Sequence, residues 1–382
     1  MEKSKIDIIT QLVNSIDLRN INYSVIKSNC NYLYNVFKDI KVCWSNNEYE
    51  HVILKIESEK YNQIMSTVNS SLLTSYDYIK KELKKINQII KLSDSNINFY
   101  YLDFGNYESD IELINKLFLQ SVCLAKYSGL YEKSEVIIIW VPINKKRDYE
   151  YKTINDENLR ESTENFNAFT ASGVTYGENP RITIISRYEE ISKLLIHELI
   201  HNFNLDGSAY HEHNDSLVKS YKKIKNPQTP SNIKNYDYSY SIYESYTELL
   251  SSYLSMIFRN IELNSKKGIL ERLEAEILLE LLYSYNTIAN LIKLNEYESY
   301  EDFELEKKFR GDICVYEYYY LKGLMYNNYE LKLCDNKKIF QDNYLNIINI
   351  KKDDPLLKDI FNNMKEQKNF RYIFYDYASG KK

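Results

Sequence analysis

Four of the five histidines in this 382-residue chain lie within 17 residues of one another, and two of these four flank a glutamate. The pattern reads His197-Glu198-Leu199-Ile200-His201. On a helix, residues four apart lie on one face about one turn apart, so both imidazoles can reach a single metal ion. Glu198 lies beside them, where it can take a proton from a metal-bound water. The motif therefore predicts a zinc centre that activates water.

An ordinary amphipathic helix with two hydrogen-bonded histidines is the simplest alternative. The residues around the motif argue against it, because they are apolar and would bury the helix, and two buried histidines without partners are costly. These apolar neighbours are Leu194, Leu195, Leu199, Ile200 and Phe203.

Two histidines need a third protein ligand to complete a zinc site. Glu244 and Glu248 share a face of a second expected helix, and that face continues through three small serines within residues 251–255. We assign Glu244 as the ligand and Glu248 as the acceptor that fixes the tautomer of a ligand histidine. The reverse assignment, with Glu248 as the ligand, and an exposed acidic pair without function remain as alternatives.

This arrangement resembles the gluzincins, the thermolysin-like class of zinc metallopeptidases, which combine a helical His-Glu-x-x-His with Glu-x-x-x-Asp/Glu on a second helix. The resemblance implies one zinc ion bound by His197, His201 and Glu244. Glu198 would be the catalytic base, and Glu248, which stands where Asp is commoner, would support a histidine.

A segment about thirty residues ahead of the motif, Asn167-Ala168-Phe169, is similar to the edge strand on which thermolysin-like enzymes hold a peptide backbone. The similarity implies that substrate binds by strand addition, along 167–175 or 181–185. Residues 182–206 show a looser similarity to predicted metallopeptidases of large DNA viruses, and the abundance of Asn, Ile, Lys and Tyr fits an AT-rich genome.

A metzincin would need a third His or Asp six residues beyond His201, with glycine in between. Here Gly207 occupies that position, Asp206 is one residue early, and Asn204 replaces the glycine, so the pattern is a near miss.

A tetrahedral oxyanion needs a hydrogen-bond donor besides the metal. Tyr210, His211 and His213 follow the motif on a polar segment and are candidates for this transition-state donor. The two histidines fit equally well as alternative ligands or as surface residues. Tyrosines at 236, 238, 240 and 243 are further candidates, but the chain contains 38 tyrosines, so none of them stands out.

Hydrophobic patterning predicts the elements that carry these residues. The β-branched run 135–142 predicts a buried central strand, and a turn at 177–180 separates two further extended segments, 167–176 and 180–186. Residues 187–203 predict the motif helix, with Glu189 and Glu190 in its first turn. Other helices are expected at 4–16, 31–40, 76–92, 241–259, 270–294 and 303–327, and a strand at 51–56.

The predicted fold is therefore α+β and helix-rich, with a zincin-like catalytic core. In it a small mixed β-sheet packs on the HExxH helix, and a mainly helical C-terminal half follows. Residues 1–130 form a mostly helical N-terminal region, 131–225 the sheet and motif helix, and 226–382 a helical subdomain with the third zinc ligand.

Charge and composition argue against nucleic acid and membranes as partners of this chain. A net charge of −5 gives no electrostatic basis for wrapping nucleic acid, and no segment resembles a signal peptide or a membrane span. The five cysteines form no Cys-x-x-Cys pair, which favours free thiols in a reducing compartment and a cytoplasmic location.

The expected function is that of a zinc-dependent metallopeptidase acting on a peptide or protein substrate, with Glu198 as general base. Two other classes remain open. One is a non-peptidase zinc hydrolase acting on a different amide or ester. The other is a catalytically inactive zincin-fold interaction protein, against which the intact Glu198 argues.

Overall fold

The computed structural model describes residues 10, 13–14, 16–44, 49–75, 77–129, 133–143, 172–176, 180–188, 190–206, 242–264, 268–294, 297–302, 316–331 and 354–363. The chain divides into two compact units. The sheet unit comprises 35–205, 250–265 and 375–382, and the helical unit comprises 1–34, 206–249 and 266–374. In these described ranges, no helix combines the length and the apolar character needed to cross a bilayer.

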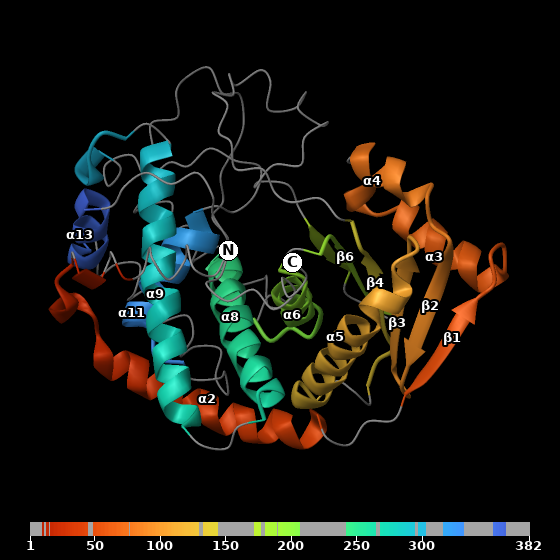
Figure 1. Cartoon of the computed structure of the whole chain (residues 1–382), viewed down its shortest axis with the longest axis horizontal. Coiled ribbons are helices and arrows are strands. Elements are labelled where there is room, and N and C mark those ends of the chain that lie inside the picture. The colour runs from red at the N-terminus through yellow and green to blue at the C-terminus, as the bar shows by residue number, and fades with distance from the viewer. Residues whose placement is uncertain are drawn as a thin grey trace. The chain divides into compact units, whose positions relative to one another are not determined.

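The sheet unit is built on a mixed sheet with the strand order β1-β2-β3-β4-β6-β5 (Figure 1). The central strands β3, β4 and β6 run parallel, whereas β1, β2 and β5 each pair antiparallel with their neighbours. Along the chain the strands are β1 (Glu50–Leu54), β2 (Gln88–Ser93), β3 (Ile97–Asp103), β4 (Val136–Val141), β5 (Gly173–Tyr176) and β6 (Arg181–Ser186). β5 pairs with β6 and ends the strand order, so it is an edge strand among the described residues.

The parallel core of the sheet follows from its sequence. All six residues of β4 are buried, because both faces of a central strand are covered and a continuous β-branched run can pack on each face. β6 aligns with β4 from Val136↔Arg181 to Val141↔Ser186. The strands expected at 135–142 and 180–186 are therefore present within one residue at each end.

Helices cover both faces of this sheet. On one face, α5 (Tyr107–Tyr127) packs on β3, and α6 (Ile191–Asn202) packs on β5, β6 and α5. On the other face, Ile137 and Ile139 of β4 join a hydrophobic cluster with Ile64 and Ile79. Those two residues belong to α3 (Glu59–Asn69) and α4 (Asp77–Leu83). The predicted mixed sheet against the motif helix is thus present.

The sheet is larger than the sequence predicts, because the helix expected at 76–92 is wrong in its second half. α4 ends at Leu83, and residues 88–93 form β2. Ile89, Ile90 and Leu92 are all fully buried, so this strand is apolar on both faces and lacks the alternation that would identify it. β3, which pairs with β2, also lies in the region expected to be mostly helical.

The helical unit contains, among its described residues, helices with the bounds η1 (Leu18–Asn20), α9 (Ile269–Leu294), η4 (Tyr316–Leu321), α11 (Lys322–Asn328) and α13 (Pro355–Asn363). α9 packs on α11 and α13. A Cβ at Gly323 would lie 2.8 Å from the Ile288 Cδ1 atom, so glycine allows α11 to approach α9. The helix expected at 270–294 matches α9, and that at 303–327 is described from residue 316 onwards.

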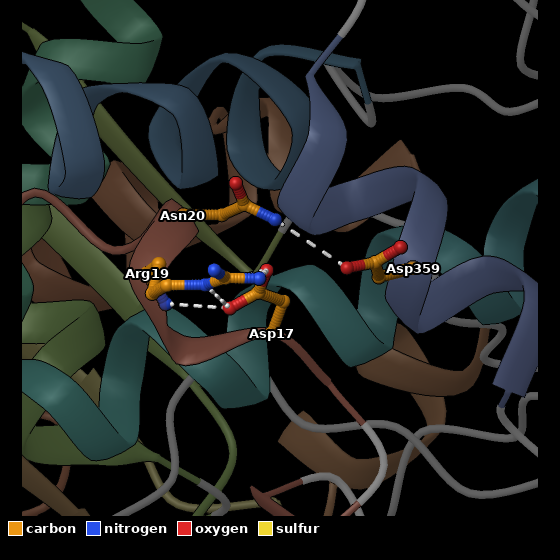
Figure 2. Close-up of polar contacts among 4 residues, drawn as sticks. All are labelled: Asp17, Arg19, Asn20 and Asp359. Carbon is orange, nitrogen blue, oxygen red and sulfur yellow. Dashed lines mark hydrogen bonds and ion pairs between the residues drawn. The ribbon is translucent and has the colours of Figure 1, made fainter.

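Polar side chains join the first and last described parts of the helical unit (Figure 2). The Asn20 side-chain amide donates to Asp359 on α13, over 3.4 Å, beside an Arg19–Asp17 ion pair. Deeper in the unit, the Asn29 amide donates to the carbonyl of residue 329, and its oxygen accepts from the backbone N–H of residue 331. These bonds connect segments about 300 residues apart in sequence.

Two long helices contribute residues to both units. α2 (Tyr23–Trp44) belongs to the helical unit through residue 34 and to the sheet unit thereafter. α8 (Ile242–Glu262), which matches the helix expected at 241–259, belongs to the helical unit through Leu249 and to the sheet unit from Leu250.

Candidate metal centre

The motif helix α6 begins later than its sequence predicts. The expected start was residue 187, but Arg187 and Glu190 have φ values of 85° and 54°, which an α-helix does not accommodate. Glu190 is therefore the residue before the helix, and the expectation that it lies in the first turn is wrong. α6 then runs from Ile191 to Asn202 with nearly every side chain buried.

The turn before α6 is held by buried polar contacts. The Trp140 indole N–H donates to the Arg187 carbonyl over 3.0 Å, and the Arg187 guanidinium lies 3.7 Å from the Glu190 carboxylate. The Tyr188 and Tyr101 hydroxyls both donate to the buried carboxylate of Asp110 on α5. Burial raises the pKa of Tyr188, helped by its bond to Asp110, so this hydroxyl keeps its proton. The start of α6 is thus fixed to the sheet and to α5.

The two motif histidines face each other across one turn of α6. Their Nε2 atoms are 3.2 Å apart, and the rings meet edge to face with centroids 4.8 Å apart. Two nitrogens that each lie 2.0–2.1 Å from a tetrahedral ion are about 3.3 Å apart. The observed separation therefore fits a pair of ligands to one metal ion.

Glu244 completes a group of three metal-ligating side chains. It lies in the first turn of α8, and one ligand atom from each of His197, His201 and Glu244 lies within 4.8 Å of the other two. α8 is one continuous helix, and from Leu250 its residues belong to the same unit as α6. The arrangement could hold a metal ion, and its two imidazoles and one carboxylate are a donor set that suits zinc.

Glu248 lies one turn further along α8 and is buried, with 3% of its surface exposed. Among the described residues, the carboxylate that converges with the histidines is that of Glu244. Glu244 therefore fits the ligand assignment better than Glu248 does. The bond from Glu248 to a ligand histidine stays a prediction.

Asp206, the acidic residue that lies one position before the third-ligand place of a metzincin, contacts a residue of α8. Asp206 is buried and accepts a hydrogen bond from the Thr247 hydroxyl over 3.1 Å. Asp206 follows α6 by four residues, and Thr247 lies on α8 between the two glutamates. Asp206 therefore ties the chain after α6 to the helix that carries Glu244.

The carboxylate of Glu198 rests against strand β5. The Thr175 hydroxyl donates to Glu198 Oε2 over 2.9 Å, and a Cβ at Gly173 would lie 2.4 Å from Oε1. Glu198 is nearly buried, with 8% of its surface exposed. Sequence reasoning did not identify Gly173 or Thr175, because neither belongs to a motif, although both fall in the extended segment expected at 167–176.

Several predicted site residues lie outside the described residues. These are Asn167, Ala168 and Phe169 of the expected substrate strand, and Tyr210, His211 and His213 of the expected donor group. The part of that strand which the structure describes is β5, residues 173–176. Comparison with protein-family models, curated proteins and solved structures finds no match to this chain.

Proposed function

We propose that this protein is a zinc-dependent metallopeptidase in which His197, His201 and Glu244 hold the ion and Glu198 is the general base. The observation that carries the proposal is the convergence of these three ligand side chains beside a nearly buried glutamate. His197, Glu198 and His201 lie within about one turn of α6, so the local geometry of that helix sets their spacing, and Glu244 comes from α8.

Zinc held by these residues supplies a Lewis acid that makes water nucleophilic at neutral pH and polarises a carbonyl group. Two imidazoles and one carboxylate would hold the ion with three protein ligands, which is the number that catalytic zinc sites use. A structural zinc site would instead have four protein ligands.

Glu198 provides the proton transfers in this proposal. Its carboxylate takes a proton from the attacking water and returns it to the leaving amine. Its low exposure excludes most of the solvent that would compete for its oxygens, and the Thr175 hydroxyl holds Oε2.

The position of β5 supports a peptide as the substrate rather than a small amide or ester. β5 is an edge strand in the described sheet, and it lies directly against Glu198 through Gly173 and Thr175. An extended peptide can add to such an edge through main-chain hydrogen bonds, which brings its backbone close to the general base.

The test combines metal analysis of the purified full chain with cleavage of a peptide library. We expect about one zinc per chain and measurable cleavage. Glu198→Gln should keep the zinc but lower kcat by about 10²–10⁴-fold, because glutamine cannot accept the proton. His201→Ala should lose metal and activity together, whereas Glu59→Gln, at an exposed glutamate on α3, should match wild type.

Two outcomes would reject the proposal. If Glu198→Gln cleaves peptides as fast as wild type, Glu198 is not the base. If the wild-type chain takes up no zinc from zinc-supplemented buffer, the convergent side chains are not a metal site.

A further inference from the structure

Strand β5 places two small residues on the face that meets α6. Gly173 and Thr175 are two apart, so their Cα–Cβ directions point to the same side of the sheet. In register with β6, Gly173 lies opposite Ile185, and Thr175 lies opposite Thr183. Val174, between them, points to the other face, where it packs on the hydrophobic cluster of β4 and α3.

We propose that Gly173 and Thr175 are positioning residues that form a seat for the Glu198 carboxylate. This inference rests on the proposed function, since the seat matters for catalysis only if Glu198 is the base. Gly173 supplies the space, because any side chain there would overlap Oε1, Cδ and Cγ of Glu198 at 2.4–2.6 Å. Thr175 supplies the bond that sets the rotation of the carboxylate.

A chain of side-chain hydrogen bonds fixes the direction of the Thr175 hydroxyl. The Asn202 amide, fully buried at the end of α6, donates to Thr183 Oγ1 over 2.8 Å. Thr183 Oγ1 accepts there, so its own proton can go to Thr175 Oγ1, 3.3 Å away. Thr175 then has its single proton to give to Glu198.

Two acceptors on Glu198 compete for that proton. The carboxylate Oε2 lies 2.9 Å from Thr175 Oγ1, and the Glu198 main-chain carbonyl lies 3.1 Å away. The bond to the carboxylate is the stronger of the two, because a hydrogen bond to a charged acceptor is shorter and about twice as strong as one to a neutral acceptor. The chain of hydrogen bonds from Asn202 through Thr183 and Thr175 therefore ends on the general base, Glu198.

The Asn202 end of this chain of hydrogen bonds is also held. The Arg181 guanidinium, on β6, donates to the Asn202 main-chain carbonyl. This bond ties the last turn of α6 to the same strand that carries Thr183. Helix α6 is thus joined to the two strands at both ends of this chain of hydrogen bonds, at Asn202 and at Glu198.

A first experiment tests the seat without measuring activity. Thr175→Val keeps the shape of threonine but removes the hydroxyl, and Glu198→Ala removes its acceptor. Urea unfolding of wild type, both single variants and the double variant gives the coupling between the two side chains. We expect non-additivity of about tenfold or more in the unfolding equilibrium, as for a bond to a charged group.

A second experiment tests the positioning role in the full chain. Thr175→Val should lower kcat on a cleaved peptide by about 10- to 100-fold, with KM and zinc content unchanged. Thr175→Ser restores the hydroxyl and should recover most of the rate. Thr67→Val, which removes a hydroxyl from α3 in the same unit, is the matched control and should leave kcat unchanged.

The outcomes separate the seat from the proposed function. Additive losses in the unfolding cycle overturn the seat, whatever the activity. Coupling together with an unchanged kcat in Thr175→Val overturns the positioning role but keeps the contact. Coupling in a chain that cleaves no peptide overturns the proposed function, and the positioning role with it, while the seat stands. Coupling with a lowered kcat that serine rescues supports the whole inference.

Discussion

Replacing Gly173 with alanine tests the close approach of β5 to the general base most directly. The new Cβ would lie 2.4 Å from Glu198 Oε1 and 2.6 Å from its Cδ and Cγ atoms, whereas ordinary van der Waals contact begins at 3.4 Å. The carboxylate must therefore retreat by 3.4 − 2.4 = 1.0 Å. The overlapping atoms are the flexible end of a side chain, so the side chain moves rather than the backbone.

A retreat of this size has a large effect on rate and a small effect on stability. Moving a catalytic group by about 1 Å costs about 10²-fold, so we expect kcat/KM for a cleaved peptide to fall by about 100-fold. Overpacking at one position lowers the free energy of unfolding by about 1–3 kcal/mol, which leaves the chain folded. Zinc content should stay at the wild-type value, because no ligand residue changes.

A second background identifies the cause of the loss. Glu198→Ala removes Cγ, Cδ and Oε1, which are the three atoms that the new methyl group would meet. Because this background lacks the general base, the comparison is made on stability. Gly173→Ala should lower the free energy of unfolding by about 1–3 kcal/mol in wild type and by less than about 0.5 kcal/mol in Glu198→Ala. Urea unfolding of the four chains gives both values. A wild-type kcat/KM in Gly173→Ala, or the same loss of unfolding free energy in both backgrounds, would refute the steric reasoning.

Three further outcomes are expected. Asp354 accepts a hydrogen bond from the Tyr285 hydroxyl over 2.9 Å, and its carboxylate caps the start of α13. Asp354→Ala should therefore lower the free energy of unfolding, measured in urea, by about 2–4 kcal/mol. A loss below about 0.5 kcal/mol would contradict this expectation. Burial raises the pKa of the Cys30 thiol to about 11 and of the Cys123 thiol to about 12 from a usual 9.0, so the folded chain keeps protons that the unfolded chain releases. The stability that these thiols contribute is therefore fully present below about pH 9 and is lost as the pH rises toward 12. In Cys123→Ala the urea midpoint should fall less steeply with rising pH than in wild type. Chelation of the metal should lower the thermal midpoint of wild type but not of His201→Ala, because only a chain that binds the ion is stabilised by it.

Sequence alone identified the features that depend on neighbouring residues. The i,i+4 spacing of His197 and His201 fixes their separation on any helix, so the paired imidazoles could be expected before the fold was known. The same local periodicity gave α8 and α9, and the β-branched run gave β4 as a buried strand. Helical hydrogen bonds join residues four apart, so the signal for a helix lies within the helix.

Tertiary structure decided the features that depend on partners far along the chain. Residues 88–92 carry apolar side chains that fit either a helix or a strand, and pairing with β1 and β3 selects the strand. The choice between Glu244 and Glu248 required the convergence of Glu244 with the two motif histidines, since both glutamates lie on one face of the same helix.

The contact of Gly173 and Thr175 with Glu198 joins residues 23 to 25 positions apart, through a strand register and a helix packing that no local pattern records. A glycine in an extended segment has the same sequence signature whether it lies at a bulge, in a turn or under a carboxylate. The packing of α6 on β5 determines which of these applies to Gly173, because the space left by the missing Cβ is filled there by the Glu198 side chain.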